Sequence, residues 1–196
     1  MRGIDGAARA FARIRRRRRR GGAGGGGRVT ATDVRMMERA IELARAAGAA
    51  GEVPIAAIVY RGDEILGEAA NNRERSADPT GHAEIVAMRI AGERIGQWRL
   101  VDCSLAVTLE PCAMCAGAIV NARVARLVYG ARDPKAGACE TLYAIPTDRR
   151  LNHRVEMHGG VLAPRCVELL RAFFKERRAQ QKALKQASKG AVHRTA

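Results

Sequence analysis

The sequence predicts an α/β domain in which helices cover both faces of a mixed sheet of about five strands. Short apolar runs rich in β-branched residues alternate with segments whose apolar residues recur at helical spacing. The 30 residues from His82 to Cys112 are enough for a helix, a connection and a strand, which suits helices packed on a sheet. We therefore expect three layers in the order α/β/α.

Five segments are expected to be strands, because each is short and mainly apolar. In chain order they are residues 53–60, 64–70, 105–109, 124–129 and 155–158. The Arg61-Gly62-Asp63 sequence between the first two is typical of a hairpin turn. Residues 71–80 are polar and are expected to form an irregular connection, and residues 130–137 a loop.

Four segments are expected to be helices, because their apolar residues follow a helical period or start and stop signals bound them. They start near Asp33, Thr80, Cys112 and Pro164 and end near Gly48, Glu93, Asn121 and Lys185. Asp33 and Thr80 are the expected N-caps of the first two. Pro111 suits the start of the third, where a missing N–H group loses no hydrogen bond.

The chain is long enough for one enzyme domain, and its positive charge is concentrated at the two ends. It has 196 residues, 47% of them hydrophobic, and a net charge of +15. Residues 1–28 carry +9 and residues 171–196 carry +7, whereas residues 29–170 carry −1. Basic ends attract polyanions, with nucleic acid as the leading candidate. We expect a disordered Arg/Gly-rich extension (1–31), a catalytic domain with a basic C-terminal helix (32–185) and a flexible tail (186–196).

The role of the N-terminal segment stays open. Six consecutive arginines, Arg15 to Arg20, precede a glycine-rich run that cannot bury enough apolar surface to order itself. We favour a solvated tail over an RNA-binding arm, an organelle transit peptide or residues upstream of the true translation start. No apolar run suits a membrane span or a secretory signal. We expect a cytoplasmic protein, or an organellar one if this segment is a transit peptide.

Two short motifs predict a catalytic zinc site. His82-Ala83-Glu84 is followed by Pro111-Cys112-Ala113-Met114-Cys115, with Cys112 28 positions after Glu84. One imidazole and two thiolates supply three ligands, and the cysteines share one face of a helix. A structural zinc site normally closes all four positions, whereas a catalytic site leaves one for water. The combination of H-x-E with P-C-x-x-C is the established signature of zinc nucleobase deaminases.

The same residues predict the reaction chemistry. A catalytic zinc ion lowers the pKa of its bound water to about 7, which provides a hydroxide nucleophile near neutral pH. Glu84 is expected to take the proton of the water, pass it to a ring nitrogen and help the amine leave as ammonia. The other cysteines are scattered and indicate ordinary small side chains in a reducing compartment; they are Cys103, Cys139 and Cys166.

Each motif by itself also has an ordinary explanation. His-x-Glu commonly marks a solvated helix start, and Cys-x-x-Cys also occurs in redox pairs, zinc fingers and protein cores. Three classes of function therefore stay open: an RNA deaminase, a deaminase of a free base or nucleotide (guanine, cytidine or deoxycytidylate), and a non-catalytic zinc-containing RNA-binding protein. The basic C-terminal segment favours the first class. Glu84 and the missing fourth ligand argue against the third.

Beyond the zinc motifs, the chain resembles bacterial tRNA-specific adenosine deaminases of the cytidine/deoxycytidylate deaminase superfamily. Residues 78–84 are similar to the first metal motif of that family, and residues 108–118 to its second. Residues 130–138 and 152–156 are similar to two later signatures. The resemblance implies a cytidine-deaminase-like fold, a homodimer, and hydrolytic conversion of adenosine to inosine at the wobble position of a tRNA anticodon.

The resemblance also implies the metal ligands and the proton shuttle. The zinc ligands of the family, one ion per subunit, fall on His82, Cys112 and Cys115. Its proton shuttle falls on Glu84. The motif chemistry points to the same four residues.

The substrate-binding residues implied by the resemblance are more widely spread. Asn71 matches the asparagine that contacts the flipped nucleotide, although the neighbouring Asn72 leaves the register open by one. Asp133 matches a loop acid near the substrate backbone; its ordinary explanation is a loop cap. Arg177 and Arg178 match the basic C-terminal helix that touches tRNA.

The chain departs from the pattern of this family at two positions. Gly81 replaces the alanine that usually precedes the histidine, and Ala70 stands where a tryptophan often precedes the asparagine. Neither change removes a group that the reaction needs, although Gly81 is expected to loosen the ligand helix slightly.

Phe173 and Phe174 are expected to dock the C-terminal helix on the body.

Overall fold

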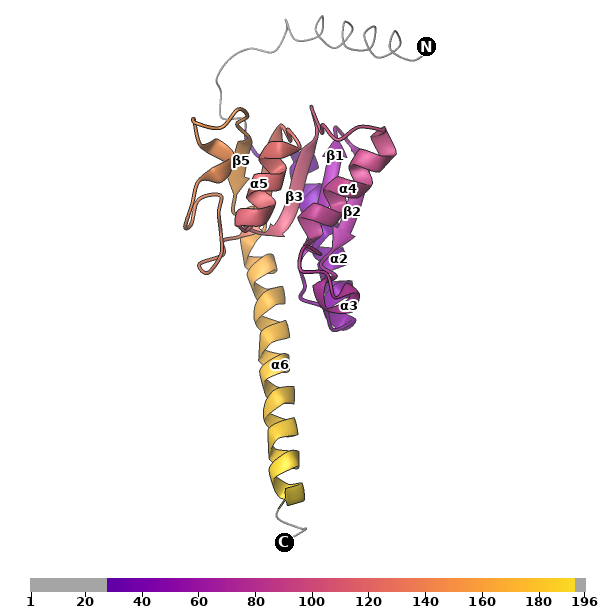
Figure 1. The fold of residues 1–196 in the computed structure, drawn as a ribbon, viewed down its shortest axis with the longest axis vertical. Coiled ribbons are helices and arrows are strands. Elements are labelled where there is room, and N and C mark those ends of the chain that lie inside the picture. The colour runs from indigo at the N-terminus through magenta and orange to yellow at the C-terminus, as the bar shows by residue number, and fades with distance from the viewer. Residues whose placement is uncertain (1–27, 193–196) are drawn as a thin grey trace, which may run out of the picture.

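The computed structural model describes residues 28–192 and contains a five-stranded mixed sheet between two layers of helices (Figure 1). The strands are β1 (Ala56–Arg61), β2 (Glu64–Ala70), β3 (Ser104–Leu109), β4 (Arg126–Ala131) and β5 (Glu156–Gly159). Their order across the sheet is β2-β1-β3-β4-β5. β1 pairs antiparallel with β2 and β3, whereas the β3–β4 and β4–β5 pairs are parallel. The predicted fold class is confirmed.

In the described residues, two long helices cover each face of the sheet. α2 (Ala31–Ala49) and the start of α6 (Ala163–Val192) pack on one face. α4 (Ala83–Ile95) and α5 (Ala113–Asn121) lie side by side on the other (Figure 1). Two shorter helices complete the described elements: α3 (Arg73–Ser76) and the 3₁₀ helix η1 (Ile145–Thr147).

Alternate residues of the central strands supply the two halves of the core. In β1, Ala57 and Val59 belong to the cluster under α4 and α5. Ile58 lies between these two residues and Tyr60 follows Val59. Both belong to the cluster under α2. Successive side chains of a strand point to opposite faces of the sheet, and here both faces are covered. This explains why the central strands are apolar runs rather than alternating sequences.

Two of the predicted helix caps were wrong. Thr30, rather than Asp33, is the N-cap of α2. Asp33 is the third helical residue and completes a capping box, in which each residue binds the backbone N–H of the other (2.8 and 3.0 Å). His82, rather than Thr80, is the N-cap of α4. Thr80 instead donates from its N–H and hydroxyl groups to Asp78.

Other boundaries differ by a few residues. β1 begins at Ala56 rather than at residue 53, β4 is shifted by two residues, and the connection over residues 71–80 contains α3. α6 continues to Val192, so the predicted flexible tail from residue 186 is helical in its first part. The three-part division of the chain stays a prediction, because residues 1–27 and 193–196 lie outside the described residues.

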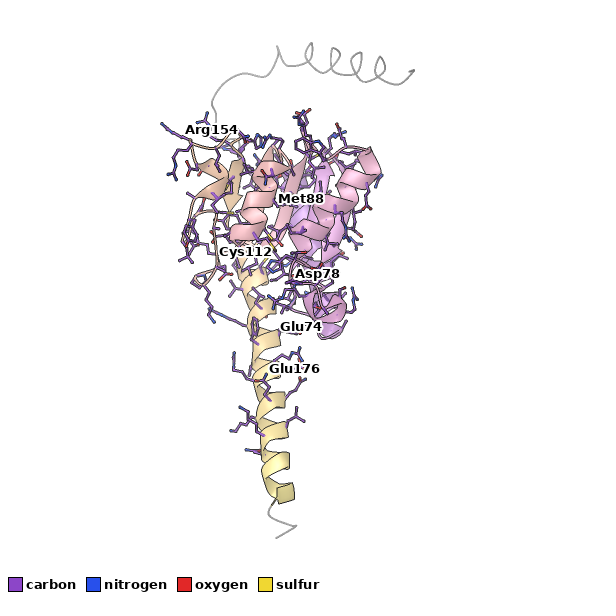
Figure 2. The ribbon with its side chains drawn as sticks, viewed as in Figure 1. Glu74, Asp78, Met88, Cys112, Arg154 and Glu176 are labelled. Carbon is purple, nitrogen blue, oxygen red and sulfur yellow. The ribbon has the colours of Figure 1, made fainter. Side chains whose placement is uncertain are left out.

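α6 is the most extended element of the structure. Its first turns pack on the sheet, and the remainder projects well beyond the body (Figure 1). Cys112 and Asp78 lie at the edge of the body toward which α6 projects (Figure 2). Among the helices of residues 28–192, none combines the length and apolar character needed to cross a membrane.

Candidate metal centre and active site

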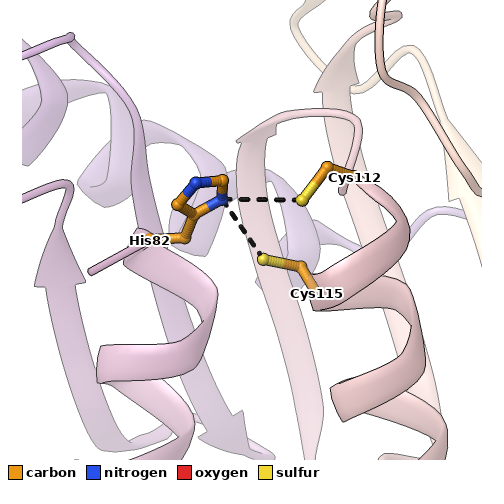
Figure 3. Close-up of side chains that lie close together, drawn as sticks. All are labelled: His82, Cys112 and Cys115. Carbon is orange, nitrogen blue, oxygen red and sulfur yellow. Dashed lines mark hydrogen bonds between the residues drawn. The ribbon is translucent and has the colours of Figure 1, made fainter. Parts of the chain in front are cut away.

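The predicted metal ligands meet where the N-termini of α4 and α5 lie next to each other. His82 is the N-cap of α4, Cys112 is the N-cap of α5, and Cys115 lies in the first turn of α5. Figure 3 shows their side chains converging from the two helices. β3 ends just before Pro111, so the site lies at the carboxyl end of a parallel strand, where open α/β sheets bind ligands.

The geometry of the three donors fits a single zinc ion. Nδ1 of His82 lies 3.6 Å from Sγ of Cys112 and 3.5 Å from Sγ of Cys115. Tetrahedral bonding at the usual Zn–N and Zn–S lengths separates nitrogen and sulfur by about 3.5 Å. All three donor atoms lie within 4.8 Å of one another, and no fourth donor from residues 28–192 joins the group. The arrangement therefore leaves one coordination position for water or substrate.

The electrostatics of the group favour an ionised Cys112. A hydrogen bond from Cys115 outweighs the effect of burial and, with a further contribution from His82, lowers the pKa of Cys112 to about 3. The contact with Cys112 in turn raises the pKa of His82. A sulfur that is ionised at neutral pH is the form that binds metal.

Glu84 lies in the first turn of α4 and is 4% exposed. Burial raises the pKa of its carboxyl group, which lies within hydrogen-bonding reach of Cys115. His82 has an extended backbone (φ −79°, ψ 144°) at the N-cap, so α4 begins directly after it and Glu84 is the second helical residue. A buried carboxyl group beside metal-binding donors has the environment of a proton shuttle.

Asn71 lies at the end of β2 and contacts a buried glutamate. Its Nδ2 is 3.5 Å from Oε1 of Glu52, and both residues are 6% exposed. Glu52 also accepts hydrogen bonds from the backbone N–H groups of Glu74 and Arg75, in α3. Glu52 and Asn71 line a cavity of about 560 Å³. Sequence reasoning missed Glu52, because a single acid before an apolar run gives no sign of burial.

The structure explains why glycine precedes the metal-binding histidine. A Cβ atom added at Gly81 would overlap Oδ1 of Asn72. This oxygen is buried and has no hydrogen-bond partner among the residues that the structure describes. The N–H of Asn72 donates to the carbonyl of Gly81 at 3.0 Å. Gly81 therefore makes room for the carboxamide of Asn72, next to His82.

Asp133 follows β4 and orders its own loop. Its Oδ1 accepts hydrogen bonds from the N–H groups of Lys135 (2.9 Å) and Ala136 (3.3 Å). Its own N–H donates to Glu110 at 3.2 Å. Glu110 is buried two residues before Cys112, and sequence reasoning gave it no role. The sequence signal that could have found it is an acid placed directly between an apolar strand and a metal ligand.

The predicted arginines lie on α6 and not at the metal centre. Arg177 donates to the carbonyl of Gly51 (3.0 Å), and its guanidinium group lies 5.5 Å from the ring centre of Phe173. Arg178 is exposed on the same helix. Phe173 is half-buried, but Phe174 is 44% exposed. The expectation that both phenylalanines dock the helix was therefore wrong for Phe174.

Comparisons with known proteins agree with this site. Residues 31–178 match the family model of MafB19-like deaminases. Over 151 residues, 76% of this chain and 87% of the relative, the chain is 45% identical to a tRNA-specific adenosine deaminase of Haemophilus influenzae. The chain belongs to the tRNA-specific adenosine deaminase family. Its predicted family and enzyme class are confirmed.

Two solved structures that are similar to this member of the adenosine deaminase family are informative. One comes from a study of A-to-I editing by tRNA deaminases at the wobble position; it has a TM-score of 0.67 and 40% identity over 69% of this chain and 99% of the other. The other is a guanine deaminase of Nitrosomonas europaea, with a TM-score of 0.62 and 26% identity over 74% and 86% of the two chains. The fold thus also occurs in a deaminase of a free purine base.

Proposed function

We propose that this chain hydrolyses the exocyclic amine of adenosine at the wobble position of a tRNA anticodon, giving inosine and ammonia. The observation that carries this proposal is the buried Glu84 beside a His–Cys–Cys group that fits zinc. The relative from Haemophilus influenzae is named for this activity on tRNA. One zinc ion per chain, held by His82, Cys112 and Cys115, is part of the proposal.

The residues of the site account for the proton transfers. A bound zinc ion would supply a Lewis acid that makes a water molecule acidic near neutral pH. Glu84 takes the proton that the attacking water releases and delivers it to the adenine ring nitrogen. A second transfer moves the remaining proton of the added hydroxyl group to the amine, so that the carbon–nitrogen bond breaks, ammonia leaves and the hydroxyl oxygen becomes the carbonyl oxygen of inosine. The raised pKa of Glu84 suits a group that must both accept and return a proton.

An RNA substrate suits the surface beside the metal centre. A base in a single-stranded anticodon loop leaves its stack at low cost. We propose that Asn71 contacts the flipped nucleotide and that Asp133 lies near its backbone. Phosphates would bind exposed cations of α6, which projects from the same edge of the body (Figure 2). These cations are Arg171, Lys175, Arg177, Arg178 and Lys182.

A homodimer and a cytoplasmic location complete the proposal. Large apolar side chains are exposed along α4, α5 and the segment after α4, including Ile90, Met114 and Trp98, the last 62% exposed. A partner subunit would cover such side chains if they belong to one contact surface. Sedimentation equilibrium of the purified chain tests the dimer. The organellar alternative depends on residues 1–28, of which all but Arg28 lie outside the described part of the chain.

A substrate panel tests the proposed reaction. The chain is incubated with an anticodon stem-loop that has adenosine at the wobble position and, separately, with guanine, cytidine and deoxycytidylate. We expect inosine in the stem-loop and no product from the others. Activity on a free base or nucleotide alone would identify the second class of function. RNA binding without deamination by zinc-loaded protein would identify the third.

The metal has its own control in the same experiment. Cys112→Ala removes one of three ligands, so we expect this variant to lose zinc and part of its stability. Elemental analysis of the wild-type chain should give one zinc per chain. Fully active protein without zinc would contradict the assignment of His82, Cys112 and Cys115.

A further inference from the structure

Glu110 is a buried carboxylate that the proton transfers do not use. It lies between β3 and the Pro111-Cys112 segment and is 2% exposed. Within residues 28–192, the groups that donate hydrogen bonds to its carboxylate belong to a single loop after β4, residues 133–141. A buried carboxylate is costly unless N–H and O–H groups surround it. The contacts therefore tie the end of β3 to the 133–141 loop.

Both oxygens of Glu110 take part. Oε1 accepts hydrogen bonds from the backbone N–H groups of Cys139 (3.1 Å), Glu140 (2.8 Å) and Thr141 (2.9 Å). Oε2 accepts from the N–H of Asp133 (3.2 Å) and from the hydroxyl of Thr141. Backbone donors that are removed from water need such acceptors. One side chain thus holds both ends of the loop.

The 133–141 loop also lies directly against the segment that carries a metal ligand. Gly137 and Cys112 form an isolated antiparallel β-bridge. The N–H of Ala138 donates to the carbonyl of Pro111 at 2.8 Å. A Cβ atom built on Gly137 would lie 2.5 Å from Oε2 of Glu110, so the loop and the carboxylate are in close contact. The position of Glu110 therefore sets the position of the loop beside Cys112.

We propose that Glu110 is a positioning residue for the substrate: it holds the 133–141 loop against Cys112 so that the loop forms one wall of the nucleotide pocket. This inference rests on the proposed function, because it assumes that a nucleotide binds beside the metal. Glu110 acts through the loop and needs no contact with the reacting atoms. Asp133, the proposed neighbour of the substrate backbone, is held by the same carboxylate.

The test replaces Glu110 by its closest uncharged analogue. In Glu110→Gln one oxygen still accepts hydrogen bonds, but an NH₂ group replaces the other and opposes the N–H of Asp133. We expect zinc content to stay at one per chain. We expect the KM for the anticodon stem-loop to rise about tenfold or more, with a smaller change in kcat, because the lost interaction acts on substrate binding. The Kd of the stem-loop, measured in the inactive Glu84→Gln background, should rise by the same factor.

A direct measurement of the loop accompanies the kinetics. Hydrogen exchange of residues 133–141 should be faster in zinc-loaded Glu110→Gln than in the wild type, because the N–H of Asp133 loses its acceptor and the amides of Cys139, Glu140 and Thr141 now donate to a neutral oxygen in place of a carboxylate. Thr141→Val removes the hydroxyl donor and keeps the backbone bonds. It should change KM and exchange in the same direction, by a smaller factor. This milder variant keeps the test valid if Glu110→Gln does not fold.

Asp33→Asn is the matched control. Asp33 is as buried as Glu110 and also accepts hydrogen bonds, but it pairs with Arg126 at the opposite end of β4 from the metal centre. This variant should lower the melting temperature without changing KM or the exchange of the 133–141 loop.

Two outcomes would overturn the proposal. If Glu110→Gln lowers the melting temperature but leaves KM and loop exchange unchanged, the residue has a structural role alone. If it loses zinc, the residue orders the metal ligand instead of the substrate wall. Failure of the wild type to deaminate the stem-loop would contradict the proposed function, while zinc content and loop exchange would still show whether Glu110 holds the loop.

Discussion

Glu84 combines burial with a position beside three metal-binding donors. Glu84→Gln keeps the shape of the side chain but cannot carry a proton. We expect it to bind zinc and fold normally while turnover of the stem-loop falls by about 10²- to 10⁴-fold. Single-turnover kinetics with elemental analysis of the same sample measure both effects. A variant with near-normal turnover would show that another group transfers the proton.

The packing of Gly81 against Asn72 gives a second prediction for single residues. Gly81→Ala should destabilise the chain by about 1–3 kcal/mol, because the added methyl group overlaps Asn72 Oδ1 and overpacked sites cost about this much. Asn72→Ala should relieve most of this loss in the double variant. Urea unfolding of the four proteins gives the coupling energy. Additive effects would contradict the proposed fit between the two residues.

At the scale of elements, α6 is the proposed RNA contact. Changing Arg177 and Arg178 to glutamine should weaken stem-loop binding and flatten its salt dependence, by up to about one unit of log–log slope for each phosphate that the helix no longer binds. Zinc content should not change, because both residues lie outside the metal centre. Binding measured across a salt series gives the slope.

Two comparisons make this prediction specific to α6. Arg94→Gln removes another exposed arginine, at the far end of α4, where it pairs with Glu64, and should leave the salt slope unchanged. Deletion of residues 1–28 tests the other basic end and should leave deamination largely intact. If the deletion abolishes binding and the α6 variant does not, the arginine-rich segment is the RNA arm.

At the scale of the whole molecule, Asp33 connects elements from both halves of the sheet. It completes the capping box of α2, accepts a hydrogen bond from Tyr60 in β1 (2.5 Å) and pairs with Arg126 in β4 (2.8 Å). Burial by itself would raise the pKa of Asp33, but the hydrogen bonds from Arg126, Thr30 and Tyr60 outweigh it and lower the pKa to about 2. The ionised form is therefore favoured in the folded state.

This shift predicts how stability depends on pH. A carboxyl group with a depressed pKa stabilises the fold above its unfolded pKa, near 4, and the contribution is lost as the pH falls through about 2. After allowance for screening by solvent, we expect about 1–2 kcal/mol. Asp33→Asn should therefore be less stable than the wild type at pH 7, with a difference that narrows below pH 4. Urea unfolding of both proteins at pH 7 and below pH 4 measures the difference in stability. A difference that does not change with pH would contradict a stabilising role for ionised Asp33.

The layers of the fold and the composition of the metal centre can be read from local sequence patterns. Apolar runs and helical periods are local patterns, so they predicted the strands and long helices to within a few residues. The metal ligands were equally accessible, because zinc requires a few residue types at short, recognisable spacings. The ligands can therefore be recognised from the sequence without knowledge of the contact between α4 and α5. They are His82, Cys112 and Cys115.

The surroundings of those ligands depend on contacts between distant segments of the chain. Glu110 and Glu52 are single acids in the sequence, and their burial depends on loops that fold back from 22 or more positions away. The fit of Asn72 to Gly81 likewise depends on a turn that brings two loop ends together. Whether a carboxylate is solvated or holds a loop in place depends on which N–H groups approach it. That approach is set by packing between segments distant in the chain, which no local pattern encodes.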